Sequence, residues 1–252
     1  MDPNTKILTS DNPSTGAQYA TMRNVPYCEA VGALMYTMLG TCPDISFATT
    51  IISKFSSNPG MVHWEAMKWI YCYLIGTKDL WLSYGGGVRE LVCYADADGS
   101  MAKDWHATLG YAFVVDGGAV SWSTKWQEIV SLLTMESEYI AVAHVSKEAL
   151  WLRSLISKVF GPFWPDTATT LFSDNQSAIA LSKDHQYHTC TKHIDIHCHF
   201  ICWIIKDGKL WLNYCPTTDM IANMLTKALP SPKVKHFAAE LRLHDVWGGV
   251  LE

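Results

Sequence analysis

The spacing of hydrophobic residues in this 252-residue chain changes close to Leu91. The order of the predicted elements after Leu91 restricts the folds that the chain can adopt. Before Leu91, apolar residues recur every three or four positions, as in amphipathic helices. Behind it, strand-like and helix-like segments follow in the order β-β-β-α-β-α-α-β-α. Three antiparallel strands followed by α/β crossovers predict a mixed five-strand sheet with flanking helices. The expected fold class is α/β, preceded by a small helical region.

The segments around this sheet can also be outlined. Residues 26–76 are expected to form three helices, the second of which begins at Pro43. A long helix is predicted for "TMESEYIAVAHVSKEALWLRSLISKVF", and a further one for "TDMIANMLTKAL". Residues 1–24 are rich in Ser, Thr, Asn, Asp and Pro and are expected to be poorly ordered. The predicted division is a leader at 1–24, a helical connection region at 25–89, an α/β domain at 90–244 and a tail at 245–252.

Composition narrows the class of protein. Hydrophobic residues make up 49% of the chain and charged residues 17%, which indicates a packed core rather than disorder. The first residues lack the features of a signal peptide, the apolar runs are too short to span a membrane, and the eight cysteines form no C-x-x-C pair. We therefore expect an intracellular protein, cytoplasmic or nuclear, with reduced thiols and no membrane partner. Most of the eleven tryptophans are expected in the core.

Acidic residues fall at the ends of predicted strands and helices. Asp96, in "YADADGS", ends the first strand of the sheet, Asp174 ends the fourth, and Glu138 lies in the first turns of the long helix. If the first and fourth strands are neighbours, the two aspartates can converge and the helix can add Glu138. Carboxylates held together repel one another unless a divalent cation neutralises them, and Mg²⁺ prefers hard oxygen ligands. Asp98 is expected at the surface, and Ala97 separates it from Asp96, unlike the adjacent aspartates of a polymerase Tyr-x-Asp-Asp motif.

Several segments together resemble the ribonuclease H domain of copia-type retrotransposon polyproteins. They are "YADADGS", "GYAFVVDGGAVSWSTKWQ", "TMESEYIAVAHVSKEALWLRSL", "LFSDNQSAIALSK", "TKHIDIHCHF" and "MIANMLTKALP". The helical region is similar to the stretch between the polymerase palm and ribonuclease H in the same polyproteins. The resemblance implies a ribonuclease H-like fold in a downstream fragment of a longer polyprotein, without the polymerase palm.

The resemblance also implies the site residues. The four metal-site acids of the family correspond to Asp96, Glu138, Asp174 and, in "ANMLTK", Asn223. Glu138 is preferred to Glu136 because "EYIA" matches the family pattern better. Asn223 departs from that pattern, since it keeps a carbonyl oxygen but removes one negative charge. We therefore expect Mg²⁺, or Mn²⁺ in its place, to bind more weakly at one of two sites.

Three further residues are candidates for contact with nucleic acid. Lys125 and Gln127 lie between the third strand and the long helix, although a solvated turn explains them equally well. His193 belongs to the family motif in "TKHIDIH". The surrounding "HTCTKHIDIHCHFIC" also suggests zinc, but there is no second ligand cluster at the usual distance. A zinc site is therefore the less favoured interpretation.

The expected function is metal-dependent hydrolysis of the RNA strand of an RNA–DNA hybrid by a two-metal mechanism, weakened by Asn223. The partner is the hybrid, recognised by its shape and its 2′-hydroxyls. The alternative is a catalytically inactive relic of a retrotransposon polyprotein that acts as a binding module. Asn223 and the net charge of −5 favour the alternative, and the three intact acids oppose it.

Overall fold

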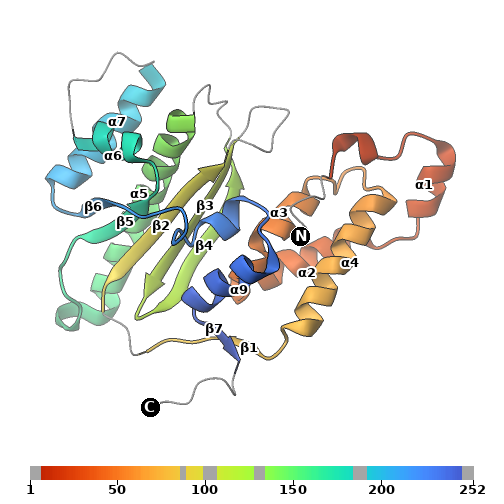
Figure 1. Cartoon of the computed structure of the whole chain (residues 1–252), viewed down its shortest axis with the longest axis horizontal. Helices are drawn as coiled ribbons and strands as arrows, with labels where there is room; N and C mark the ends of the chain where they lie inside the picture. Colours follow the sequence, from red (N-terminus) through yellow and green to blue (C-terminus); the bar gives the residue numbers. More distant parts are fainter. Residues whose placement is uncertain (1–6, 86–88, 99–106, 128–133, 184–191, 246–252) are drawn as a thin grey trace.

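The computed structural model describes residues 7–85, 89–98, 107–127, 134–183 and 192–245 (Figure 1), apart from the side chains at 9, 134–136, 178, 181–183 and 192–198. Its centre is a five-stranded sheet in the order β4-β3-β2-β5-β6. The strands are β2 (Leu91–Asp98), β3 (Thr108–Val115), β4 (Gly118–Trp126), β5 (Thr169–Ser173) and β6 (Leu210–Tyr214). The first three are antiparallel, and β5 and β6 continue the sheet in parallel. The predicted mixed five-strand sheet is confirmed, with its first and fourth strands as neighbours.

The turn between β3 and β4 follows directly from its sequence. Val115 pairs with Gly118, so the loop consists of Asp116 and Gly117 alone. Both have positive φ angles, 50° and 82°. This is the geometry of a two-residue hairpin turn whose twist matches that of the strands, and Asp-Gly is among the sequences that adopt it most readily.

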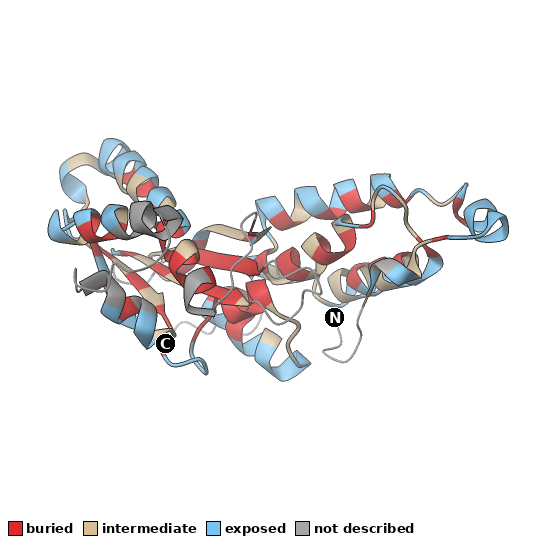
Figure 2. Ribbon diagram, turned by 90° about the horizontal axis from the view of Figure 1, so that it is seen from above, coloured by how far each residue is buried: buried red, intermediate tan, exposed pale blue. Residues whose placement is uncertain are grey.

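Helices cover both faces of the sheet. On one face, α5 (Thr134–Phe160) packs against the strands, while α6 (Gln176–Lys183) and α7 (Lys192–Lys206) pack against α5. The hydrophobic core between these helices and the sheet includes Cys93, Leu109, Phe113, Tyr139, Val142 and Leu171. The other face is covered by α8 (Asn223–Thr226) and α9 (Ser231–Glu240), with a separate core that includes Ala112, Leu225 and Phe237. Figure 2 shows the buried residues along the sheet and on the inner sides of the helices. The predicted long helix is confirmed.

The helical region forms a third packed unit at one side of the sheet (Figure 1). Residues 26–76 contain α2 (Tyr27–Gly40), the short η2 (Pro43–Ile45), α3 (Ser46–Ser53) and α4 (Met61–Gly76), and no strand. This confirms the three predicted helices. The predicted leader contains regular structure from residue 7 onward. Those residues include η1 (Thr9–Asp11) and α1 (Gly16–Met22), which begins with a Thr15–Gln18 capping box.

Hydrogen bonds join the helical region to the sheet. The Trp122 indole N–H donates to the Met38 carbonyl at 2.7 Å, and the Ser46 hydroxyl donates to Thr124 Oγ1 at 3.1 Å. The Thr124 hydroxyl in turn donates to the Leu225 carbonyl at 2.8 Å. A two-stranded sheet of β1 (Leu80–Leu82) and β7 (Leu243–Asp245) adds a second link. The last part of the chain is therefore tied to both regions.

Two expectations from the sequence are wrong. The helix predicted for "TDMIANMLTKAL" is reduced to α8, because residues 220–226 are all buried and cross the interior instead of resting on it with one face. None of the tryptophans whose side chains are described is buried, and Trp69 is 73% exposed. No helix within the described ranges combines the length and apolar character needed to cross a membrane.

Candidate metal centre

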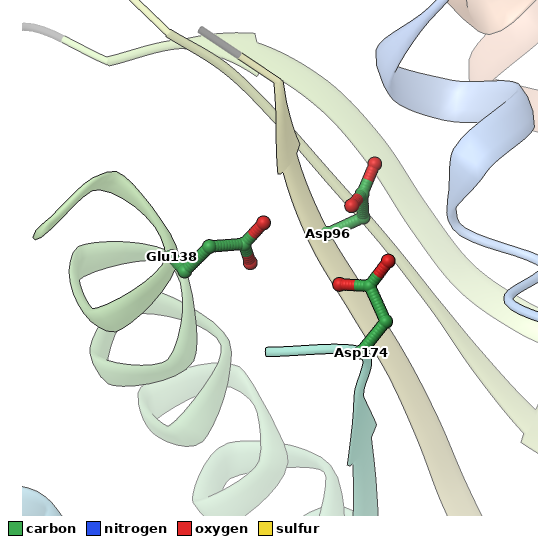
Figure 3. Close-up of side chains that lie close together, drawn as sticks. All are labelled: Asp96, Glu138 and Asp174. Atoms are coloured by element: carbon green, nitrogen blue, oxygen red, sulfur yellow. The ribbon is translucent and has the colours of Figure 1, made fainter. Parts of the chain in front are cut away.

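Three carboxylates converge at one end of the central strands (Figure 3). Asp96 lies near the end of β2, Asp174 directly follows β5, and Glu138 is in the first turns of α5. One oxygen from each carboxylate can be chosen such that all three lie within 4.8 Å of one another. The convergence expected from the order of the elements is therefore present.

Strand register explains why the two aspartates meet. β2 and β5 are parallel neighbours in which Tyr94 is paired with Phe172. Two residues further along each strand lie Asp96 and Asp174, so they emerge side by side at the same end of the sheet. The start of α5 is held against this end by Gln127, whose Nε2 donates to the Ser137 carbonyl at 2.7 Å. That bond fixes the helix one residue before Glu138.

Burial gives this cluster its electrostatic character. Asp96 is 2% exposed and Glu138 is 4% exposed. Burial, followed by repulsion from Asp96 and Asp174, raises the pKa of Glu138 from 4.5 to about 9. Burial also raises the pKa of Asp96, an effect that the Lys227 ammonium opposes. In the absence of a cation, Glu138 therefore holds a proton at neutral pH, because three charged carboxylates cannot share this buried site.

A segment near the end of the chain, residues 217–227, surrounds the aspartates. The Thr226 hydroxyl donates to Asp96 Oδ2, and Lys227 Nζ lies 3.5 Å from the same oxygen. The Thr217 hydroxyl donates to Asp174 Oδ2 at 2.9 Å. The Asn223 side-chain amide donates to the Thr217 carbonyl at 2.7 Å. We call residues 217–227 the clasp, because its side chains hold both aspartates from outside the sheet.

Gly110 allows the clasp to approach. It is paired with Asp96 across β2 and β3, and a Cβ atom at this position would lie 2.7 Å from Thr226 Cγ2 and 2.8 Å from Leu225 Cβ. A side chain here would therefore push α8 away from Asp96. A glycine in the interior of a strand is a known sign of such close approach, and it is the one signal in the sequence that could have revealed the clasp.

The other predicted site residues have different positions. Lys125 is exposed on β4, as a contact with nucleic acid requires. Gln127 is 6% exposed and bonded to Ser137, so its amide is not presented to a ligand in this structure. The side chains of His193, of the other zinc candidates Cys190, His197 and Cys198, and of Glu136 lie outside the described residues. Asp98, expected at the surface, is partly buried.

The residues present fit a divalent cation. Glu138 Oε2 and Asn223 Oδ1 are buried oxygen atoms without a hydrogen-bond partner within the described part of the chain. Such acceptors can take an ion, but other buried atoms of this structure, Asp44 Oδ1 among them, share the property, so the fit rests on the set of carboxylates. Carboxylate and amide oxygens are also the donors that Mg²⁺ prefers. The cluster of Asp96, Glu138 and Asp174 can therefore hold a divalent metal ion.

Comparison with known proteins agrees with the residue pattern. No family model matches the sequence. The retrovirus-related Pol polyprotein from transposon TNT 1-94 of Nicotiana tabacum is 42% identical over 224 residues, which cover 88% of this chain and 16% of that polyprotein. Over most of its length the chain is similar to retrovirus-related Pol polyproteins from transposons. It spans about a sixth of the length of that relative, and it resembles the copia-type ribonuclease H region together with the helical stretch that precedes it.

Two further proteins are similar to this chain. A Plasmopara viticola protein named secreted RxLR effector protein 161 is 42% identical over 133 residues, which are 52% of this chain and 94% of that protein. Among solved structures, LC11-RNase H1 from compost is 16% identical over an alignment that covers 55% of this chain and 94% of the other, with a TM-score of 0.40. The fold of this chain is α/β, with a five-stranded mixed sheet and flanking helices.

Proposed function

We propose that the chain is a retrotransposon-derived ribonuclease H that hydrolyses the RNA strand of RNA–DNA hybrids. The observation that carries this proposal is the convergence of Asp96, Glu138 and Asp174 within 4.8 Å, supplied by three separate elements of the fold. Gathering three carboxylates in a buried site opposes folding unless a cation or a proton compensates. The resemblance to the ribonuclease H region of transposon polyproteins supports this substrate class, and it assigns the same three positions to metal ligands.

The same residues define the proposed mechanism. Asp96, Glu138 and Asp174 would hold the cation, with Asn223 Oδ1 as an additional donor. Bound Mg²⁺ or Mn²⁺ would supply an activated water for in-line attack on phosphorus and stabilise the leaving 3′ oxygen. The threonine hydroxyls of the clasp each engage one oxygen of an aspartate, which fixes the direction in which the other oxygen points. Glu138 must release its proton before it can act as an anionic ligand.

Residues outside the acidic cluster are proposed to contact the nucleic acid or to position the cluster. Lys125, exposed on β4, is proposed to contact a phosphate of the hybrid, and His193 in α7 is proposed to do the same. Gln127 is assigned an indirect role, because its hydrogen bond to Ser137 anchors the helix turn that carries Glu138. Recognition through the backbone and the 2′-hydroxyls would make the activity independent of base sequence.

A second function is favoured by a specific feature of the site. Asn223 stands where the family pattern has an acid, which removes one negative charge. This change reduces the attraction for cations, which would suit a catalytically inactive relic that binds nucleic acid or protein. The hybrid itself distinguishes the two functions, because a binding module would retain it without cleaving it.

The deciding experiment is a cleavage assay with the full chain. Labelled RNA–DNA hybrid, RNA duplex, DNA duplex and single-stranded RNA are incubated with Mg²⁺, with Mn²⁺ and with EDTA. Ribonuclease H activity predicts cleavage of the RNA strand of the hybrid alone, and only when a cation is present. Hybrid that is bound but left intact with either cation, by protein shown to be folded, would support the binding module instead.

A further inference from the structure

One divalent cation balances the charge of the proposed metal ligands and Lys227, whereas two would exceed it. Asp96, Glu138 and Asp174 contribute three negative charges when ionised, and Lys227 contributes one positive charge at 3.5 Å from Asp96 Oδ2. The remaining two negative charges match one divalent cation. A second cation would leave the protein site with two excess positive charges, and like charges at such distances repel strongly in a buried setting.

The position of Lys227 is fixed by the fold. Its backbone N–H donates to the Asn223 carbonyl at 3.2 Å, which places it directly behind α8. Its side chain is 30% exposed and also lines a mainly apolar cavity of about 700 Å³ between the helical region and the clasp. An aliphatic stem can lie along such a wall while the ammonium group extends to a polar partner.

The two carboxylates that line this cavity already have partners. Asp44 accepts a hydrogen bond from the Tyr73 hydroxyl at 2.6 Å, and Glu65 forms an ion pair with Lys68 at 2.7 Å. Asp96 is therefore the acid that engages Lys227 in this structure. It is 2% exposed, so the ion pair is poorly screened on the side of the carboxylate.

We propose that Lys227 is a charge-balancing residue that limits the nucleic-acid-free site to one divalent cation. Its ammonium group neutralises Asp96 where a second cation would otherwise be needed, and Asn223 lacks the charge that would attract that cation. A second cation then binds only when the phosphates of a hybrid add negative charge. This inference rests on the proposed function, because it assumes that the acidic cluster binds metal.

Manganese titration of the nucleic-acid-free protein tests the proposal, with free Mn²⁺ counted by electron paramagnetic resonance. Wild type should bind one Mn²⁺ tightly. Lys227→Met should bind that ion about tenfold more tightly and take up a second one measurably. Lys227→Arg should behave as wild type, because it keeps the charge. Lys209→Met, which removes a surface lysine paired with Asp207, is the charge-matched control and should also titrate as wild type.

The possible outcomes separate the inference from the function. Two Mn²⁺ ions bound equally tightly by wild type, or an unchanged titration for Lys227→Met, would overturn the inference and leave hybrid cleavage untouched. If Lys227→Met lowers the melting temperature and leaves the Mn²⁺ titration unchanged, Lys227 is a structural ion-pair partner and the inference is wrong. Binding that survives Asp174→Asn in full would show that the ions lie elsewhere, which removes the metal site on which the proposed function depends.

Discussion

Both regions of the molecule bury a carboxylate, but they stabilise it differently. In the helical region, burial raises the pKa of Asp44, and hydrogen bonds from the Tyr73 hydroxyl and from the backbone oppose that rise. In the sheet region, Asp96 faces two further carboxylates, Glu138 and Asp174. A single buried acid can be neutralised by one proton, whereas a cluster repels itself until a cation or several protons enter. In this molecule, buried acids therefore indicate a functional site only where acids from separate elements meet.

The largest expected effect separates these two acids. Asp174→Asn should lower hybrid cleavage at least about 100-fold, because it removes a charged ligand from the proposed metal site while preserving its shape. Asp44→Asn should leave cleavage unchanged, since the amide oxygen still accepts from Tyr73. Initial cleavage rates at saturating Mg²⁺ check both variants. Equal losses in the two variants would mean that Asp174 matters only for stability.

The next effect concerns pH. The folded protein keeps the Glu138 proton up to about pH 9, whereas the unfolded chain releases it near its ordinary pKa of 4.5. Between these values the native state binds more protons than the unfolded state, so this group makes stability fall as pH rises. In EDTA, the melting temperature should therefore decline from pH 5 to pH 9 more steeply for wild type than for Glu138→Gln.

Addition of Mg²⁺ should change the pH dependence of the melting temperature. The cation replaces the proton on Glu138, so it should flatten the pH profile of wild type and raise the melting temperature most at high pH. Asp44→Asn should respond to Mg²⁺ as wild type does, because Asp44 lies outside the cluster. A wild-type profile identical to that of Glu138→Gln in EDTA would show that Glu138 is not the group that carries the extra proton.

A smaller effect compares a glycine from each region. Gly110→Ala in β3 should destabilise the protein by about 1–3 kcal/mol, because the new methyl group would clash with Leu225 and Thr226. Gly32→Ala in α2 has no atom within 4 Å of the new methyl group and should stabilise by about 0.5–1 kcal/mol. Urea unfolding measures both free energies. Two changes of the same sign would contradict the close approach of α8 to β3.

The sequence predicts those parts of the site that follow from local patterns. Strands β2 to β5 and helix α5 have clear hydrophobic periods, and Asp96, Glu138 and Asp174 are located by their positions along those elements. Which strands are neighbours follows from general rules of connection. The carboxylate positions therefore follow from one-dimensional information.

The contacts of the clasp cannot be predicted from local sequence patterns. The hydroxyls of Thr217 and Thr226 and the ammonium of Lys227 are ordinary polar groups in the sequence, and only tertiary packing brings them to the aspartates. The pairing of β1 with β7 joins segments separated by about 160 residues and has no local signature. The exposed tryptophans, Trp69 among them, were misassigned because composition cannot distinguish a core aromatic from a surface one.

The smallest expected effect is that of Asn223→Asp, because two contributions oppose each other. The added negative charge should increase the attraction for a cation. The variant also loses the amide hydrogen that donates to the Thr217 carbonyl, and a carboxylate oxygen in its place would repel that carbonyl. Since the Thr217 hydroxyl holds Asp174, loosening the clasp would offset part of the gain. We expect hybrid cleavage to rise only a few-fold, equivalent to about 1 kcal/mol.

Thr217→Val makes the two contributions of Asn223→Asp separable, because it removes the hydroxyl on Asp174 and keeps the backbone carbonyl. If loosening of the clasp limits the gain, Asn223→Asp should improve cleavage by a larger factor in the Thr217→Val background than in wild type, since the bond to Asp174 is already absent there. Cleavage rates of the four proteins at several Mg²⁺ concentrations give this comparison. Equal factors in the two backgrounds would show that the charge of residue 223 acts independently of the clasp, and a fall in both would show that Asn223 serves this site better than an acid.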